Sequence, residues 1–142
     1  MALLLVVMGV LFNSLWQAQK AELYTRGRTE ALDGMRIGIN RMAKDLRQTY
    51  DINGTPTATS MDVDTYVKGE RAHVVYDMSG GTLTRTEDGG APVVIQGGLT
   101  NSSIFIYDPD APNIVKIVFA VKPSNLPDTE LTLDAEVQFR NR

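Results

Sequence analysis

The side chains in this sequence that could carry chemistry are one histidine and three close pairs of acidic residues. His73 is the only histidine, and the 142-residue chain contains no cysteine. Disulfides, thiolate nucleophiles and cysteine-ligated metals are therefore excluded. The three acidic pairs are Asp62 with Asp64, Glu87 with Asp88, and Asp108 with Asp110. Carboxylate oxygens are suitable calcium ligands, although acidic pairs of this kind more often lie on solvent-exposed strand faces or in turns.

Catalytic motifs are missing from the sequence. It has no G-x-S-x-G, no glycine-rich phosphate loop and no H-E-x-x-H. His73 falls on the polar side of an expected strand, where a lone histidine is structural far more often than catalytic. Tyr66, Tyr76 and Tyr107 suit a core or sheet better than a sugar-binding platform. We therefore predict no enzyme activity, no cofactor and no metal site.

Charge is distributed unevenly along the chain. Residues 1–50 hold seven Lys and Arg against four Asp and Glu, a net of +3, and residues 51–142 hold seven against thirteen, a net of −6. A nucleic-acid surface needs clustered positive charge. An acidic carboxy-terminal part therefore argues against a nucleic-acid partner.

The amino-terminal stretch is uncharged as far as Lys20 and begins with an unbroken apolar run. This run, the head, comprises Leu3, Leu4, Leu5, Val6, Val7, Met8, Gly9, Val10, Leu11 and Phe12. It is shorter than the roughly 20 residues that cross a bilayer, although uncharged Asn13 to Gln19 could extend it into the interface. A secretory signal peptide would need a basic region, which is missing. A helix buried on one face rarely needs apolar residues all round. We therefore favour a membrane-inserted helix end that can also pack against its own copies.

The helical pattern continues beyond the head as an amphipathic spine. Its apolar positions are spaced by three or four residues, which places them on one helix face; they are Leu32, Met35, Ile39, Met42, Leu46 and Tyr50. The positions on the opposite face of the helix are expected to face solvent; they are Arg36, Arg41, Lys44, Asp45 and Arg47. We predict that Leu32, Met35, Ile39, Met42 and Leu46 pack on a sheet, and that the helix ends near Asn53–Gly54. Glycines at 9, 27, 34 and 38 fit either tolerated surface positions or close helix approach.

From Ser60 onward the hydrophobic period changes to two. Strands are expected at residues 61–67, 72–78, 82–86, 93–95, 104–107, 114–121 and 131–139. Alternation of this kind is typical of an antiparallel sheet with one buried face. The predicted fold is α+β, a long N-terminal helix packed on an antiparallel β-sheet. Its parts are the membrane or filament-core head at 1–18, the spine at 19–52 and the globular β domain at 53–142.

The order of these parts resembles that of type IV pilins and of the pseudopilins of type II secretion. The nearest likeness is to the minor subunits called J-type or PilW-type. Residues 36–48 look like the family's spine ending, and residues 74–85 look like its strand–glycine–strand hairpin. Arg140–Asn141 matches the close of the last strand. The family's glycine–glutamate leader signature is absent, and residues 3–10 look like the segment that normally follows it, so we expect the printed sequence to begin just after that glutamate.

The resemblance implies a structural subunit of an extracytoplasmic pilus or pseudopilus. Its head would sit in the inner membrane before assembly and would then pack against the N-terminal helices of other subunits in the filament core. A minor pilin that primes or caps assembly is the leading expectation. A major pilin that forms the shaft, and a membrane-anchored extracytoplasmic binding module that does not polymerise, are the alternatives.

Overall fold

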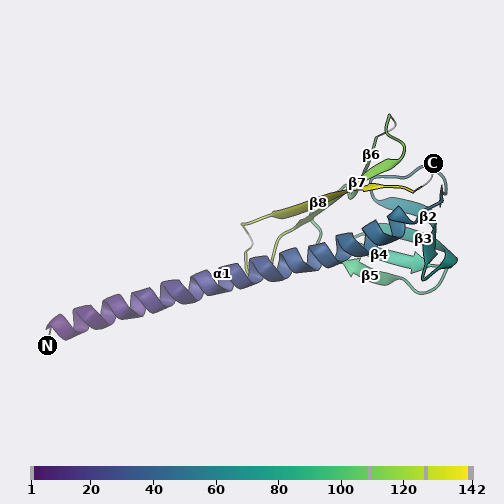
Figure 1. Ribbon diagram of the computed structural model, residues 1–142. Coiled ribbons are helices and arrows are strands. Elements are labelled where there is room, and N and C mark those ends of the chain that lie inside the picture. The colour runs from purple at the N-terminus through teal and green to yellow at the C-terminus, as the bar shows by residue number, and fades with distance from the viewer. Residues whose placement is uncertain (1, 109, 127, 141–142) are drawn as a thin grey trace.

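A single long helix runs from the amino terminus into the globular domain. The computed structural model describes residues 2–108, 110–126 and 128–140, with helix side chains from residue 7 onward. Helix α1 (Ala2–Arg47) is continuous, and no proline interrupts the sequence before Pro56. It ends slightly before the predicted boundary, where the amide of Thr49 donates to the carbonyl of Leu46 at 3.2 Å. In Figure 1 the sheets gather around its C-terminal half, and its N-terminal half extends away from them.

The strands form two antiparallel sheets, which confirms the predicted α+β class but divides the expected single sheet. The larger sheet has the order β1-β2-β3-β4-β5, with strands β1 (Asp51–Ile52), β2 (Ser60–Val67), β3 (Glu70–Ser79), β4 (Thr82–Glu87) and β5 (Val93–Gln96). The smaller sheet has the order β6-β7-β8, with strands β6 (Phe105–Tyr107), β7 (Ile114–Val121) and β8 (Leu131–Gln138). Strand β1 was not predicted; it follows the helix directly and pairs with β2.

The core lies where the apolar stripe of α1 meets both sheets. Met35, Met42 and Leu46 are fully buried, Ile39 is nearly so, and Leu32 is partly buried against the same cluster. They pack with inward residues of both sheets, including Val63, Val74, Leu83, Ile117, Phe119 and Val137. Because burial of apolar surface is the main stabilising term in folding, this stripe fixes the helix to the domain.

Two of the four spine and head glycines mark places where other segments approach the helix closely. A Cβ on Gly38 would lie 3.0 Å from Phe119 Cε2 and 3.4 Å from Ile95 Cγ2. A Cβ on Gly27 would collide with the side chain of Asn125, whose Nδ2 donates to the carbonyl of Leu23 at 3.1 Å. Gly9 and Gly34 have no comparable neighbour. Close approach of another segment therefore explains the glycines at Gly27 and Gly38, but not those at Gly9 and Gly34.

Replacing Gly38 by valine should lower the free energy of unfolding by about 1–3 kcal/mol, because the added methyl groups would overpack the contact with Phe119. Denaturant unfolding followed by circular dichroism would measure the loss. Gly34→Ala is the matched control, since its Cβ would meet only Gln96 Oε1 at 3.8 Å, and alanine is the better helix former. Equal unfolding midpoints for Gly38→Val and the unaltered chain would contradict the proposed tight packing.

Candidate functional site

The part of α1 outside the domain carries exposed apolar side chains. Phe12 is 75% exposed and Leu11 58%, and Val7, Met8 and Val10 are also exposed. The side chains of Leu3, Leu4, Leu5 and Val6 lie outside the described residues. Within the described part of the chain, no helix has a stretch long and apolar enough to cross a membrane. Val7 to Phe12 are thus not covered by this molecule's own domain.

Apolar exposure extends further along the helix than the predicted head. Leu15, Trp16 and Leu23 are each more than half exposed, and Tyr24 is also exposed. Lys20 places its Nζ 4.0 Å from the centroid of the Trp16 ring, a cation–π contact. Large exposed apolar patches on a folded protein mark interaction sites. The predicted head segment at 1–18 includes Leu15 and Trp16, whereas Leu23 and Tyr24 lie beyond it, after the charged Lys20 and Glu22.

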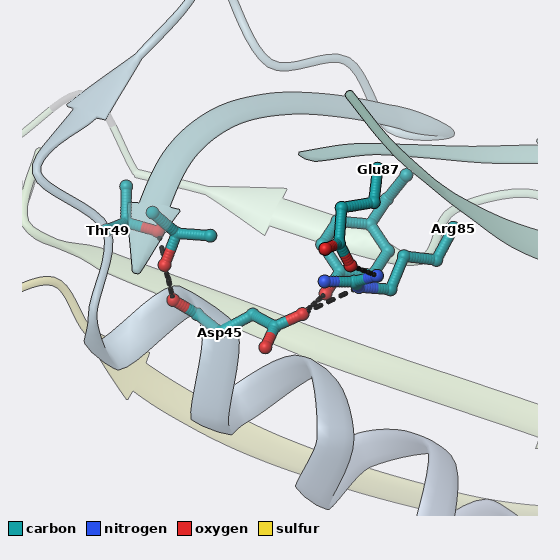
Figure 2. Close-up of polar contacts among 6 residues, drawn as sticks. Asp45, Thr49, Arg85 and Glu87 are labelled. Carbon is teal, nitrogen blue, oxygen red and sulfur yellow. Dashed lines mark hydrogen bonds and ion pairs between the residues drawn. The ribbon is translucent and has the colours of Figure 1, made fainter. Parts of the chain in front are cut away.

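At the other end of the helix, Asp45 corrects a prediction. It was assigned to the wet face of the spine, but it is only 8% exposed. The larger sheet covers this position: Arg85 Nε on β4 donates to Asp45 Oδ2 at 2.8 Å, and the Tyr76 hydroxyl on β3 donates to the same oxygen at 2.7 Å. Figure 2 shows Arg85 and Glu87 reaching toward Asp45 from the sheet. A charged group at the edge of the stripe is therefore buried with its counter-ion.

Further hydrogen bonds complete this Asp45 network, which comprises Asp45, Thr49, Thr65, Tyr76, Arg85 and Glu87. Arg85 Nη1 donates to Glu87 Oε2 at 2.6 Å. Thr65 Oγ1 on β2 donates to the backbone carbonyl of Asp45 at 2.6 Å, and Thr49 Oγ1 donates to it at 3.3 Å. Among the described residues no buried side-chain nitrogen or oxygen lacks a partner. The network ties the last turns of α1 to β2, β3 and β4 and gives the helix a fixed direction relative to the domain.

The protonation of the network is fixed by its surroundings. Burial raises the pKa of Tyr76 far above its usual range, and the Asp45 charge and hydrogen bond raise it further. Burial alone would lower the pKa of Arg85, but the hydrogen bonds that Arg85 donates to Glu87 and Asp45, together with the charge of Asp45, outweigh burial and raise this pKa. Tyr76 is therefore a neutral donor and Arg85 a permanent cation, so the network holds rather than transfers protons.

Stability should fall with rising pH above about 10, the pKa of an unperturbed tyrosine. The raised pKa keeps Tyr76 protonated in the folded state; the unfolded state then releases its proton, so the slope is negative, at most about 1.4 kcal/mol per pH unit. Tyr76→Phe should remove this part of the slope and lower stability at neutral pH by about 1–3 kcal/mol, because Asp45 loses a donor. Denaturant unfolding from pH 7 to pH 11 would measure both effects. Parallel alkaline losses in the two proteins would contradict the assignment.

Beside the network lies an open hollow of about 580 Å³. It sits between α1, the turn that joins β2 to β3, and the end of β4. Its lining includes Arg41, Lys44, Lys68 and Glu70, together with Asp45, Arg85 and Glu87 of the network. This hollow was not predictable from the sequence, because its residues come from three separate segments.

Of the residues first considered for chemistry, His73 contacts Asp62 through its ring and Asp88 through its backbone amide. His73 Nε2 lies 2.6 Å from Asp62 Oδ1 on the exposed side of the larger sheet. Asp88 and Asp108 lie in turns, where each accepts a backbone hydrogen bond. In the described ranges no group of three or more His, Asp or Glu could hold a metal ion.

Two features thus stand out on the molecule: the exposed apolar side chains of α1 beyond the domain, and the buried network that fixes this helix to the sheet. The first can bind lipid or other helices, and the second sets the direction in which the helix projects. Comparison with protein-family models, with curated proteins and with solved structures found no match for this chain.

Proposed function

We propose that this chain is a structural, non-enzymatic subunit of an extracytoplasmic filament of the type IV pilus or type II secretion pseudopilus kind. The observation that carries the proposal is one continuous helix, α1, with two roles along its length. From Met35 to Leu46 it buries an apolar stripe in the domain, and from Val7 to Tyr24 it exposes apolar side chains. Such a helix offers a surface for other copies while its domain stays folded.

The physical basis is that the exposed apolar side chains can be covered in two ways. Before assembly they would lie in the inner membrane, with the globular domain outside the cytoplasm. In the filament they would be covered by the N-terminal helices of neighbouring subunits. Lipid and helix surfaces are similarly apolar, so transfer between them avoids the cost of roughly 25 cal/mol per Å² for exposing apolar surface to water.

A minor subunit that primes or caps the filament is the specific role we propose, following the resemblance to J-type and PilW-type subunits. A major pilin of the shaft and an anchored binding module are the competing roles. A fixed orientation of α1 relative to the globular domain suits any subunit of a filament, because the domains of neighbouring subunits must repeat with constant spacing. The Asp45 network supports this, since it joins the end of α1 to three strands.

The test is the location and abundance of the chain in cells that assemble such filaments. Surface filaments are sheared off, and the chain is quantified by immunoblot in the sheared fraction and in the membrane fraction. A minor subunit should be present in both, at a small fraction of the main subunit. A dominant amount in the sheared fraction would assign the shaft instead. Presence in the membrane alone would support an anchored module and overturn the filament proposal.

A further inference from the structure

The hollow beside the Asp45 network has cations that its own residues do not neutralise. Arg85 is paired with both Asp45 and Glu87. The rim of the hollow then holds Arg41, Lys44 and Lys68 against the single carboxylate of Glu70. Within the described part of the chain none of these three cations has an ion pair or a side-chain hydrogen bond. Counting the network residues as well, the lining has four cations against three carboxylates, so the hollow is a concave site with an excess of one positive charge.

One of these cations is held in a backbone conformation that disfavours it. Lys68 and Gly69 form the two-residue turn between β2 and β3, and Lys68 has a φ of 53°. Asn or Asp usually occupies this left-handed position of such turns. Asp88, with a φ of 50°, has a local reason to be there, since its Oδ1 accepts from the amide of His73 at 2.8 Å. Lys68 has no such contact, and an unexplained strained residue points to a function.

A complementary surface occurs on the outer face of the same sheet. Asp51 on β1 and Asp64 on β2 stand directly opposite each other in register. Like charges at opposed cross-strand positions are destabilising, and neither carboxylate has an ion-pair partner among the described residues. Arg71, which also projects outward, lies over the Tyr50 ring at 5.3 Å instead. Asp51 and Asp64 thus form an unneutralised acidic pair.

We infer that the hollow of one copy of this chain binds the Asp51–Asp64 pair of a neighbouring copy. The inference rests on the proposed filament, in the competing role in which copies of this chain are neighbours along the shaft. A single contact would neutralise the rim cations and the opposed aspartates, both of which are unfavourable in the isolated chain. Neither Asp51 nor Asp64 lines the hollow, so the contact joins two different surfaces. Such a head-to-tail contact leaves one surface free on each end copy, and it repeats along an open filament when the rotation between copies does not close a ring.

Charge exchange tests this contact in the full-length chain. Lys44→Glu with Lys68→Glu should raise the critical concentration for filament assembly at low salt about tenfold or more, because the hollow would then repel the acidic pair of the neighbouring copy instead of attracting it. Asp51→Lys with Asp64→Lys should do the same. The chain carrying all four changes should assemble at nearly the unaltered concentration, since the attraction is restored. Arg28→Glu with Lys122→Glu, two exposed cations outside the hollow, is the matched control and should have no comparable effect.

A single substitution separates a binding role of Lys68 from a structural one. Lys68→Asn should raise the melting temperature by a few degrees, because asparagine tolerates the left-handed conformation. The same change should weaken assembly several-fold, because a rim cation is lost. Higher stability with unchanged assembly would overturn the role of Lys68 in the contact.

Disulfide trapping locates the contact directly, because the chain contains no cysteine. A Lys68→Cys chain mixed with an Asp64→Cys chain should form cross-linked dimers under mild oxidation during assembly, and a mixture with Lys122→Cys should not. Unaffected assembly of both double reversals, or no rescue in the fourfold variant, would overturn this contact and leave the filament proposal standing. Failure of the unaltered chain to assemble on its own would overturn this contact, whereas the filament proposal is decided by recovery of the chain in the sheared fraction. Inorganic phosphate provides the last comparison. If phosphate stabilises the unaltered chain, if Lys44→Glu with Lys68→Glu abolishes that stabilisation, and if the fourfold variant does not recover assembly, then the hollow binds free anions and the contact is overturned.

Discussion

Replacing Asp45 by leucine should lower the free energy of unfolding by about 3–5 kcal/mol, because Arg85 would remain buried without its buried counter-ion and would keep only the partly exposed Glu87. The Arg85 side chain is only 5% exposed, and the Asp45 carboxylate lies 2.8 Å from its Nε. Tyr76 would lose its acceptor at the same time. Denaturant unfolding at neutral pH gives the change directly. Because a domain is typically stable by only 5–15 kcal/mol, this single substitution should remove a large share of the total.

A double variant and a surface pair show whether burial causes the loss. Asp45→Leu with Arg85→Met should be much closer to the unaltered chain than Asp45→Leu alone, since removing both charges leaves no buried ion. Asp33→Leu is the matched control on the same helix, because its pair with Arg36 spans 3.7 Å and is well exposed; it should cost less than about 1 kcal/mol. Equal losses for Asp45→Leu and Asp33→Leu would mean that the Asp45 network does not hold α1 in place.

The helix and most strands were predictable because their periodicities are local properties of the sequence. The three- and four-residue spacing of Met35, Ile39, Met42 and Leu46 corresponds to buried positions. Alternation along 131–139 likewise separates buried or half-buried residues from exposed ones. These patterns decide which face of an element is covered, so they identify the α+β class from the sequence alone.

The number of sheets was not predictable from alternation, because one sheet or two sheets can bury the same faces. The division falls between β5 and β6, where Asn101 holds an irregular segment. Its Nδ2 donates to the carbonyls of Ser103 and Val118, and its Oδ1 accepts from the amide of Ala120. In the sequence this position indicated only a break. The contacts that turn the break into a change of sheet join residues up to 19 positions apart.

The Asp45 error has a similar origin. Asp45 lies three residues after Met42 and next to Leu46, at the edge of the apolar stripe, and a charge there was assigned to solvent. Arg85 lies two residues after the buried Leu83 on β4 and therefore on the same inward face, so the sequence also contained an inward cation. Forty residues separate the two partners, and neither local pattern indicates that they meet. The hollow was not predicted for the same reason, because its rim brings together residues of α1 and of the turn at Lys68, which are distant in the sequence.

The strongest test of the proposed function is a charge in the head. Val7→Asp should nearly abolish membrane retention and recovery in sheared filaments, because a charge in the middle of a membrane-inserted helix costs about 2.5–3.5 kcal/mol. Fractionation of cells into membrane, soluble and sheared fractions measures the loss. The side chain of Val7 is about half exposed in the isolated chain, so the melting temperature of the domain should not change.

Asn40→Asp places the same charge on the same helix at an exposed position within the domain and should leave fractionation unchanged. The contrast between the two variants separates a requirement for an apolar head from a general effect of added charge. Loss of filaments with retained membrane binding in Val7→Asp would show that helix packing, rather than lipid, requires the apolar surface. Normal membrane retention and normal filament recovery in Val7→Asp would contradict the proposed role of α1, because its exposed apolar side chains would then need neither lipid nor other subunits to cover them.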